Sequence, residues 1–228
     1  PVNYGGATDQ YQHRKMLGAG IGFATEAQIA ELAARAEVDL TAGALGIHEQ
    51  PEYTVGVTFE EMVAHGRVAA RHGVPLCLHL RHSKPDPPSD QEEGIDEAIR
   101  VARETGCRIH IEHINSTGGT GRMVEAVAQV DAARAEGLSI TACVYPYTFW
   151  ATNAGSARFD DFRAKYGIDY GDLQVPNTPD RLTEATFRKA RTDNLLTAAF
   201  AMSEEDVTDA LAAPWVMIGS DSILESHH

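Results

Sequence analysis

The chain has 228 residues, of which 43% are hydrophobic and 23% are charged, and its formal net charge is −14. This length and composition are those of a globular protein that can bury a sizeable core. The negative charge argues against nucleic acid and against an anionic membrane as partners, because their phosphate groups would repel the chain. No apolar run approaches the roughly 20 residues that a membrane-spanning helix needs.

Three cysteines, Cys77, Cys107 and Cys143, stand in or beside apolar runs, and no Cys-x-x-Cys pattern occurs. An odd number of thiols without that spacing argues against a disulfide framework and predicts a cytoplasmic protein. We expect Cys107 and Cys143 to be small core residues. Cys77 alternates onto the same face as His79, so a role near a metal ion is an alternative for it.

The first two thirds of the chain alternate helical and strand-like segments. A helix opens at Ala24-Thr25, and the run of small residues at 40–47 is predicted to be a strand. Thr58-Phe-Glu-Glu61 is a capping box that opens the next helix, which closes at His72-Gly73. The predicted elements that follow are a strand at 75–80, a polar loop at 82–89, a helix at 92–105, a strand at 108–114, a helix at 122–136 and a strand at 138–144.

The regular alternation stops after that strand. Residues 145–178 are rich in Tyr, Phe, Asp and Gly, and a long segment of this kind often forms a lid over a functional site. Another helix is predicted to start at Thr178-Pro179. The last predicted elements are a strand at 195–201, a short helix capped by Ser203 and a buried strand at 215–218.

Repeated strand–helix units with very apolar strands predict a parallel sheet covered by helices. A closed (β/α)8 barrel and a doubly wound sheet both satisfy this rule, but no Gly-x-Gly-x-x-Gly or Walker motif supports the second. A barrel needs about 250 residues, so the roughly five or six strands counted here would leave out its first units. We expect residues 1–228 to form a single but incomplete catalytic barrel domain. The first residue is Pro1 and the last two are His227-His228, so we expect either a processed or trimmed chain or part of a longer protein.

Two histidines stand at equivalent places in consecutive strand–helix units. His79 lies near the end of the apolar run 75–81, and His113 near the end of the run 108–115. The segment 94–104 between them has helical spacing, so the two strands should be parallel and adjacent. Because neighbouring strands lie about 5 Å apart, the two imidazoles could share one metal ion. Neutral imidazole suits zinc and similar ions.

Asp221 is the third candidate for the metal site. It ends the run 216–221 at another predicted strand end, which in a barrel faces the mouth of the active site. The structural alternative is a turn or helix N-cap residue. Its carboxylate could ligate a metal ion and also act as a catalytic base toward metal-bound water.

Four residues near these strand ends are candidates for substrate binding, and each has a structural alternative. Arg81 could bind an anionic group or pair with a nearby carboxylate. Tyr145 and Tyr147 could donate hydrogen bonds to a substrate or pack beneath the long segment that follows them. Asn115 could orient a substrate or cap a loop.

Four more polar residues are weaker candidates. His48 and His82 are placed near the mouth but rank below the main histidine pair. Glu112 alternates to the face opposite His113, so a structural role is expected for it. His110 is predicted to be a surface or helix-packing residue.

Several of these stretches, taken together, resemble the N-acyl-D-amino-acid deacylases (D-aminoacylases) of the amidohydrolase superfamily. They are spread over most of residues 40–222 in the order that the family has. The matching stretches are 78–81, 94–103, 111–113, 131–137, 145–148, 202–206 and 216–221.

The resemblance implies a (β/α)8 barrel that uses metal-activated water to cleave a C–N amide bond of an N-acyl amino acid-like substrate. The implied cofactor is zinc, as one or two ions, with other divalent metals as alternatives. His79 and His113 match metal ligands of the family, and Tyr145 matches a position that contacts the substrate. Asp221 matches the general acid/base, which takes the proton of the water and passes it to the leaving amine.

The chain departs from the family pattern in two ways. The paired His-x-His of the family and its bridging cysteine or carboxylate, which would precede Pro1, are absent from this sequence. A lysine often stands where this chain has Asn115, which favours an uncharged or cyclic amide as substrate. A cyclic-amide hydrolase of the hydantoinase or dihydroorotase type and a metal-free barrel relative that acts as a binding module are therefore the alternatives. The expected partner is a small-molecule amide, and a homo-oligomer is possible.

Overall fold

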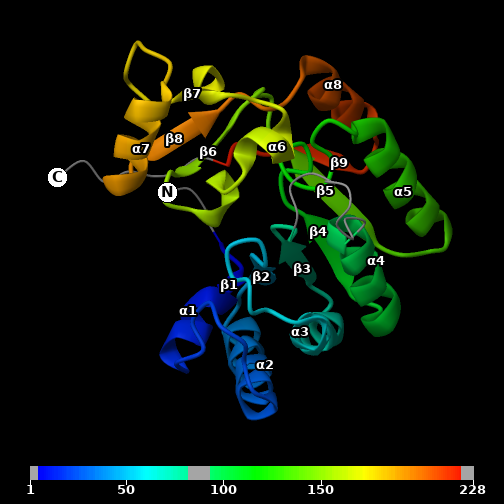
Figure 1. Ribbon diagram of the computed structural model, residues 1–228. Helices are drawn as coiled ribbons and strands as arrows, with labels where there is room; N and C mark the ends of the chain where they lie inside the picture. Colours follow the sequence, from blue (N-terminus) through cyan, green and yellow to red (C-terminus); the bar gives the residue numbers. More distant parts are fainter. Residues whose placement is uncertain (1–4, 82–92, 222–228) are drawn as a thin grey trace, which may run out of the picture.

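A computed structural model of the protein describes residues 5–81 and 93–221. The loop predicted at 82–89 with His82, and the terminal His227-His228, lie outside these residues. Six parallel strands form one sheet in chain order, each hydrogen-bonded to the next (Figure 1). The strands are β1 (Thr8–Asp9), β2 (Ile47–Glu49), β3 (Pro75–Leu78), β4 (Arg108–Ile111), β5 (Ile140–Val144) and β9 (Val216–Ile218).

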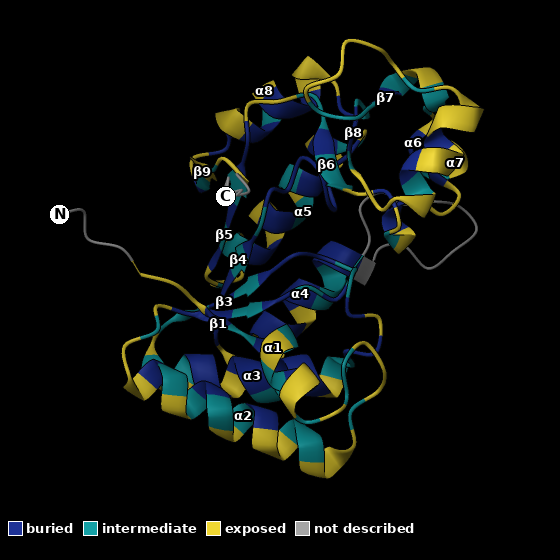
Figure 2. Cartoon of the chain, turned by 90° about the vertical axis from the view of Figure 1, so that its left-hand side faces the viewer, coloured by how far each residue is buried: buried dark blue, intermediate teal, exposed yellow. Residues whose placement is uncertain are grey.

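Helices connect these strands and cover one face of the sheet (Figure 1). The strand residues on that face are buried, as Figure 2 shows, and they belong to one continuous apolar core. The opposite face carries His48, Cys77, His110 and Thr141, which are paired across neighbouring strands and are only partly buried. The helices are α1 (Gln10–Met16), α2 (Glu26–Thr41), α3 (Phe59–His72), α4 (Glu93–Thr105), α5 (Met123–Ala135) and α8 (Glu204–Ala212).

Local capping signals place most helix ends where the sequence predicts them. Thr25 caps α2 in a capping box, and Gly73 ends α3 in the left-handed conformation at φ 65°. The Thr58 side chain accepts the N–H of Glu61 at the start of α3. The reciprocal half of that predicted capping box is replaced, because the Glu61 carboxylate pairs with Arg14 of α1 instead.

Two predicted boundaries differ most from the structure. The strand predicted at 40–47 is in fact the last turn of α2, a loop and the first residue of β2. Leu32, Ala36 and Leu40 recur every four residues and are buried, so the apolar stripe of α2 continues into the predicted strand. The helix predicted at Thr178 begins at Glu184, where Thr183 and Thr186 form the capping box.

The segment after β5 folds into a unit of its own, which we call the insertion (residues 145–202). Its three-stranded antiparallel sheet has the order β6–β8–β7 and contains the strand predicted at 195–201, which therefore lies outside the parallel sheet. An aromatic core that includes Trp150, Phe159 and Phe187 holds it together. The predicted long segment 145–178 thus carries regular structure, and its role as a lid stays a prediction. The elements are β6 (Trp150–Asn153), α6 (Phe162–Tyr166), β7 (Leu173–Gln174), α7 (Glu184–Thr192) and β8 (Leu196–Ala199), with 3-10 turns at Ala157–Phe159 and Tyr170–Asp172.

The last strand, β9, was predicted to be buried and is not. Met217 is 50% exposed and Ile218 is 72% exposed. Within the described part of the chain β9 pairs only with β5, so one of its edges has no neighbouring strand to cover it. No helix among the described residues is long and apolar enough to cross a bilayer.

Candidate active site

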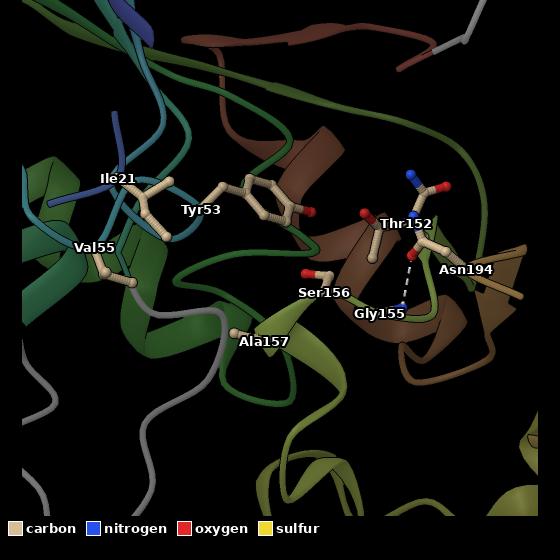
Figure 3. Close-up of a pocket in the computed structure, with 9 residues that line it drawn as sticks. Ile21, Tyr53, Val55, Thr152, Gly155, Ser156, Ala157 and Asn194 are labelled. Atoms are coloured by element: carbon tan, nitrogen blue, oxygen red, sulfur yellow. Dashed lines mark hydrogen bonds between the residues drawn. The ribbon is translucent and has the colours of Figure 1, made fainter. Parts of the chain in front are cut away.

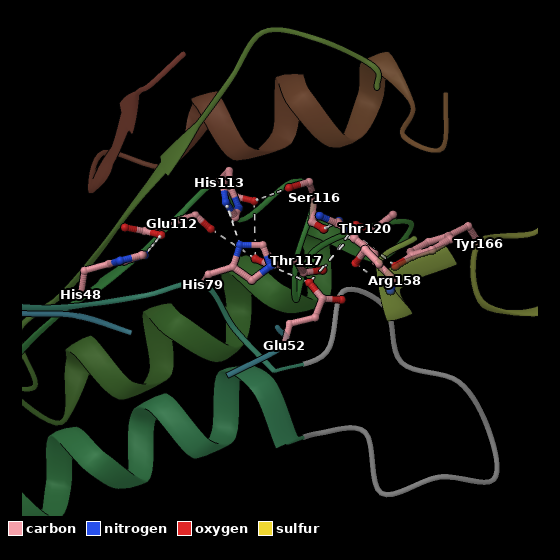
Figure 4. Close-up of polar contacts among 11 residues, drawn as sticks. His48, Glu52, His79, Glu112, His113, Ser116, Thr117, Thr120, Arg158 and Tyr166 are labelled. Carbon is pink, nitrogen blue, oxygen red and sulfur yellow. Dashed lines mark hydrogen bonds and ion pairs between the residues drawn. The ribbon is translucent and has the colours of Figure 1, made fainter. Parts of the chain in front are cut away.

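The predicted histidine pair meets at the carboxyl ends of two adjacent strands. β3 and β4 are parallel, with Leu78 opposite Ile111, and each histidine follows its strand directly or by one further residue. His79 Nδ1 lies 3.1 Å from His113 Nε2, and the two ring centroids are 4.6 Å apart (Figure 4). Both residues are buried. The β–α–β argument made from the sequence therefore placed the two imidazoles correctly.

The second nitrogen of His79 is held from the other side. Its Nε2 lies 2.5 Å from Oε2 of Glu52, which belongs to the loop after β2 (Figure 4). The Tyr53 ring packs on the same imidazole, with centroids 4.7 Å apart. Because a carboxylate can only accept a hydrogen bond, Nε2 of the neutral His79 ring carries the hydrogen, and Nδ1, which faces His113, has the free lone pair.

Glu112 joins this pair, contrary to the expectation from strand alternation. A ring nitrogen of His79, a ring nitrogen of His113 and a carboxylate oxygen of Glu112 all lie within 4.8 Å of one another. Alternation fails here because β4 ends at Ile111 and His113 has a left-handed backbone conformation with φ 32°. That turn brings two consecutive side chains to the same site. The Glu112 carboxylate also lies 3.2 Å from His48 Nε2.

A cavity of about 220 Å³ opens beside His113. Asp221 and Tyr145 line it together with Cys143, whose sulfur accepts a hydrogen bond from the His113 backbone N–H at 3.1 Å. Cys143 is therefore part of the cavity wall and not the core residue that was predicted. The predicted surface residue His110 also lines this cavity. The structure thus brings Asp221 to the same cavity as His113 and Glu112, although it is outside the set of three ligand groups.

The charges around the cavity favour a neutral His113. Burial, reinforced by His79 and Arg158, holds the pKa of His113 well below its ordinary value. Desolvation also raises the pKa of the Asp221 carboxyl, although much of the residue is exposed, while His79 and Arg158 oppose that rise. A neutral imidazole and a carboxyl with a raised pKa are the protonation properties that a metal ligand and a proton acceptor need.

His48 and Glu112 form a pair with opposite pKa shifts. Desolvation lowers the pKa of His48, but the hydrogen bond and charge of Glu112 outweigh it, so the pKa is raised. Desolvation raises the pKa of Glu112, but the bond to His48 and the nearby imidazoles outweigh it, so the pKa is lowered. Each group therefore stabilises the charged form of the other.

The predicted substrate-binding residues are divided between the site and the scaffold. Tyr145 is buried, and its ring centroid lies 6.0 Å from that of His113; burial raises the pKa of its hydroxyl. Tyr147 stacks on Tyr145 at 5.6 Å and is 40% exposed, so it is open to a ligand. Asn115 is fully buried, and its amide donates to the Tyr145 carbonyl at 3.0 Å.

Arg81 points its guanidinium toward the scaffold. Its Nε and Nη2 donate to the Glu97 carboxylate at 3.1 and 3.3 Å, and Nη2 also donates to the Val57 carbonyl at 2.8 Å. This bidentate pair favours the structural alternative, and substrate binding by Arg81 stays a prediction.

Arg158, which sequence reasoning missed, brings a buried positive charge from the insertion to the site (Figure 4). Its Nε lies 3.9 Å from Glu52 Oε2, and its guanidinium lies 4.0 Å above the Trp150 ring. Glu52 could have been found by the strand-end argument, because it follows β2 closely. Arg158 gave no such signal, because it comes from a segment that leaves the strand–helix pattern.

A second cavity, of about 570 Å³, is lined by Tyr53. Its walls come from Ile21 and Val55 on one side and from Thr152, Ser156 and Asn194 of the insertion on the other. Figure 3 shows the Tyr53 ring pointing between these walls. Because the same ring packs on His79, this cavity adjoins the histidine pair.

No protein-family model matches the chain. Over 200 residues the chain is 26% identical to an N-acyl-D-glutamate deacylase from Alcaligenes xylosoxydans xylosoxydans. The matched region is 83% of this chain and 40% of that protein. Over 136 residues it is 29% identical to a dihydroorotase from Pelotomaculum thermopropionicum. This second matched region is 60% of this chain and 29% of that protein.

Solved structures agree with the first of these relatives. An N-acyl-D-glutamate deacylase from Bordetella bronchiseptica, complexed with zinc and a phosphonate mimic of the tetrahedral intermediate, has a TM-score of 0.71 and 23% identity. The superposed region is 88% of this chain and 44% of the deacylase chain. A D-aminoacylase studied for its binuclear metal center has a TM-score of 0.67 and 22% identity, over 87% of this chain and 43% of its own.

The chain resembles the D-aminoacylases in both sequence and fold. The predicted resemblance is thereby confirmed, and so is the predicted (β/α)8 barrel fold. The described residues supply six parallel strands of such a barrel. The chain spans about two fifths of the length of the deacylases that it matches.

Proposed function

We propose that the protein is a zinc-dependent amidohydrolase of the D-aminoacylase type, which cleaves the C–N amide bond of an N-acyl amino acid. The observation that carries this proposal is the buried pair His79 and His113, whose ring nitrogens face each other at 3.1 Å at two parallel strand ends. The deacylase relative and the zinc-bound deacylase structure support it. The binuclear center of a D-aminoacylase supports one or two ions.

The donor groups fit a zinc ion. His79 Nδ1 and His113 Nε2 converge, burial keeps His113 neutral, and Glu112 adds a carboxylate within reach of both. Two imidazoles and one carboxylate are a known ligand set for catalytic zinc, which leaves a position open for water or substrate. A bound ion would polarise the amide carbonyl and lower the pKa of water.

Asp221 is the group that we assign to proton transfer. Its carboxyl lines the cavity beside His113, and desolvation raises its pKa above the ordinary value. A carboxylate in that position can accept the proton of the attacking water and return it to the leaving amine. Tyr145, which lines the same cavity, and Tyr147, which stacks on Tyr145, are the residues that we propose to contact the substrate.

The test is hydrolysis of a panel of N-acyl-D- and N-acyl-L-amino acids by the whole zinc-loaded protein. We expect amine release that a chelator abolishes and zinc restores, and a loss of about 100-fold or more in kcat for Asp221→Asn. Asp180→Asn, at an exposed position, is the matched control and should keep full activity. Full activity of Asp221→Asn would remove this residue from the mechanism.

A cyclic-amide hydrolase is the second candidate, and the dihydroorotase relative is the observation that favours it. The absence of a lysine at Asn115 points the same way, since it removes a charge that could hold a linear substrate carboxylate. Ring opening of dihydroorotate or a hydantoin, without release of amine from linear N-acyl compounds, would select this candidate. A metal-free binding module would show no hydrolysis of either class.

The remaining partners follow from charge and composition. We propose a small-molecule amide as the ligand and exclude nucleic acid as a partner, because the net charge is −14. All three cysteines are free, which supports the proposed cytoplasmic location. We retain one catalytic domain over residues 1–228 as a proposal, and a homo-oligomer stays a prediction.

A further inference from the structure

The two ring nitrogens of His79 have separate partners. Nδ1 faces His113, while Nε2 faces the Glu52 carboxylate at 2.5 Å. A carboxylate in this position holds the proton on Nε2 and fixes the ring plane. The lone pair of Nδ1 is then directed toward His113 and Glu112, where the proposed function places the ion.

Glu52 is in turn held by a charge from the insertion. The Arg158 guanidinium lies 3.9 Å from the same Glu52 oxygen, and its side chain is 2% exposed. Arg158 is itself fixed on three sides. It donates to the Ser116 carbonyl, lies 3.4 Å from the Tyr166 hydroxyl and stacks on Trp150.

We propose that Arg158, Glu52 and His79 form a triad in which Glu52 and Arg158 are positioning residues for the metal site. The triad joins the loop after β2, the end of β3 and the insertion at one buried point. It rests on the proposed metal site and adds to it a role for the insertion, which orients a ligand without touching the ion.

The arrangement makes the triad more than a local salt bridge. Glu52, Arg158 and His79 are all nearly inaccessible to solvent, so their charges are poorly screened and their geometry is fixed. Loss of a carboxylate that orients a ligating histidine typically weakens metal binding by about 10- to 100-fold. The histidine, the ligand count and the fold all remain in such a variant.

Zinc affinity of the whole protein, measured by competition with a chromophoric chelator, tests the triad. We expect Glu52→Gln to weaken zinc binding by about 10-fold or more. Arg158→Met should also weaken zinc binding, and Glu52→Asp should bind zinc more tightly than Glu52→Gln but less tightly than the wild type. Glu97→Gln is the matched control, because Glu97 on α4 is also a partly buried carboxylate but pairs with Arg81. It should bind zinc like the wild type.

A second readout separates positioning from simple loss of stability. In the metal-free protein, 15N NMR should show His79 protonated at Nε2, and Glu52→Gln should reduce that preference while urea unfolding still shows a cooperative fold. Zinc affinity of Glu52→Gln and Arg158→Met within twofold of the wild type would overturn the triad but leave the metal site intact. A wild type that binds no zinc would overturn the proposed function first, and the triad with it.

Discussion

A buried ion pair between α1 and α3 is expected to be one of the main supports of the N-terminal half. Arg14 and Glu61 are both 0% exposed, and Arg14 Nη1 contacts both oxygens of the carboxylate, one of them at 2.5 Å. Arg14 Nε also donates to the Gly20 carbonyl at 2.9 Å, and Nη2 donates to the Gly22 carbonyl. One guanidinium therefore satisfies a buried charge and two loop carbonyls.

The substitution Arg14→Met should lower the free energy of unfolding by about 3–5 kcal/mol, because it leaves the Glu61 carboxylate buried without its counter-charge. The two loop carbonyls lose their donor at the same time. The double variant Arg14→Met/Glu61→Leu should recover most of this loss, since it removes both buried charges. Urea unfolding followed by circular dichroism measures all three proteins.

An exposed pair provides the matched control. Arg71 and Glu37 lie 2.6 Å apart, with side chains 59% and 40% exposed. Pairs of this kind contribute about 0–1 kcal/mol, so Arg71→Met should change the free energy of unfolding by no more than that. If Arg14→Met costs as little as Arg71→Met, the reasoning from burial is refuted.

Three further predictions concern pH, the insertion and a thiol. Desolvation raises the pKa of Glu61 although Arg14 opposes the rise; loss of Arg14 should raise it further, so the folded variant binds a proton that the unfolded chain releases. The stability deficit of Arg14→Met should therefore shrink as the pH falls from 7 toward the ordinary glutamate value of 4.5, and an equal deficit at pH 7 and pH 5 in urea unfolding would contradict this. Phe187 is 5% exposed and its ring centroid lies 5.2 Å from that of Phe162, so Phe187→Ala should lower the free energy of unfolding by about 3–5 kcal/mol. If the insertion of this variant resists proteolysis as well as that of the wild type, the idea of a separate aromatic core is wrong. Burial raises the pKa of the Cys107 thiol, so iodoacetamide at pH 8.5 should alkylate it at least about 10-fold more slowly in the folded protein than in urea, and equal rates by mass spectrometry would show that the thiol is accessible.

The sequence was a good guide wherever the determining interactions are local. Thr25, Thr58 and Ser203 cap helices because their side chains accept N–H groups three residues later. His79 and His113 could be paired because one helix-length segment separates two apolar strands, and such units are right-handed and parallel.

The errors arose where one local signal overrode another or where distant segments meet. The strand predicted at 40–47 failed because the apolar stripe of α2 extends to Leu40. Glu112 was expected on the face opposite His113, but the turn at His113 breaks strand alternation and brings both side chains to one site. Arg158 reaches Glu52 across more than 100 positions of sequence, and nothing in either local pattern indicates that contact.

The central claim is that His79 and His113 hold a metal ion, and zinc content of the purified whole protein tests it most directly. After dialysis against metal-free buffer, the wild type and the control His72→Ala should retain at least one zinc ion per chain by mass spectrometry of the metal. His72 is a suitable control because it pairs with Glu37 on α2, away from the site. His113→Ala should lose the ion while its circular dichroism spectrum stays folded. Equal zinc content in His113→Ala and the wild type would contradict the account.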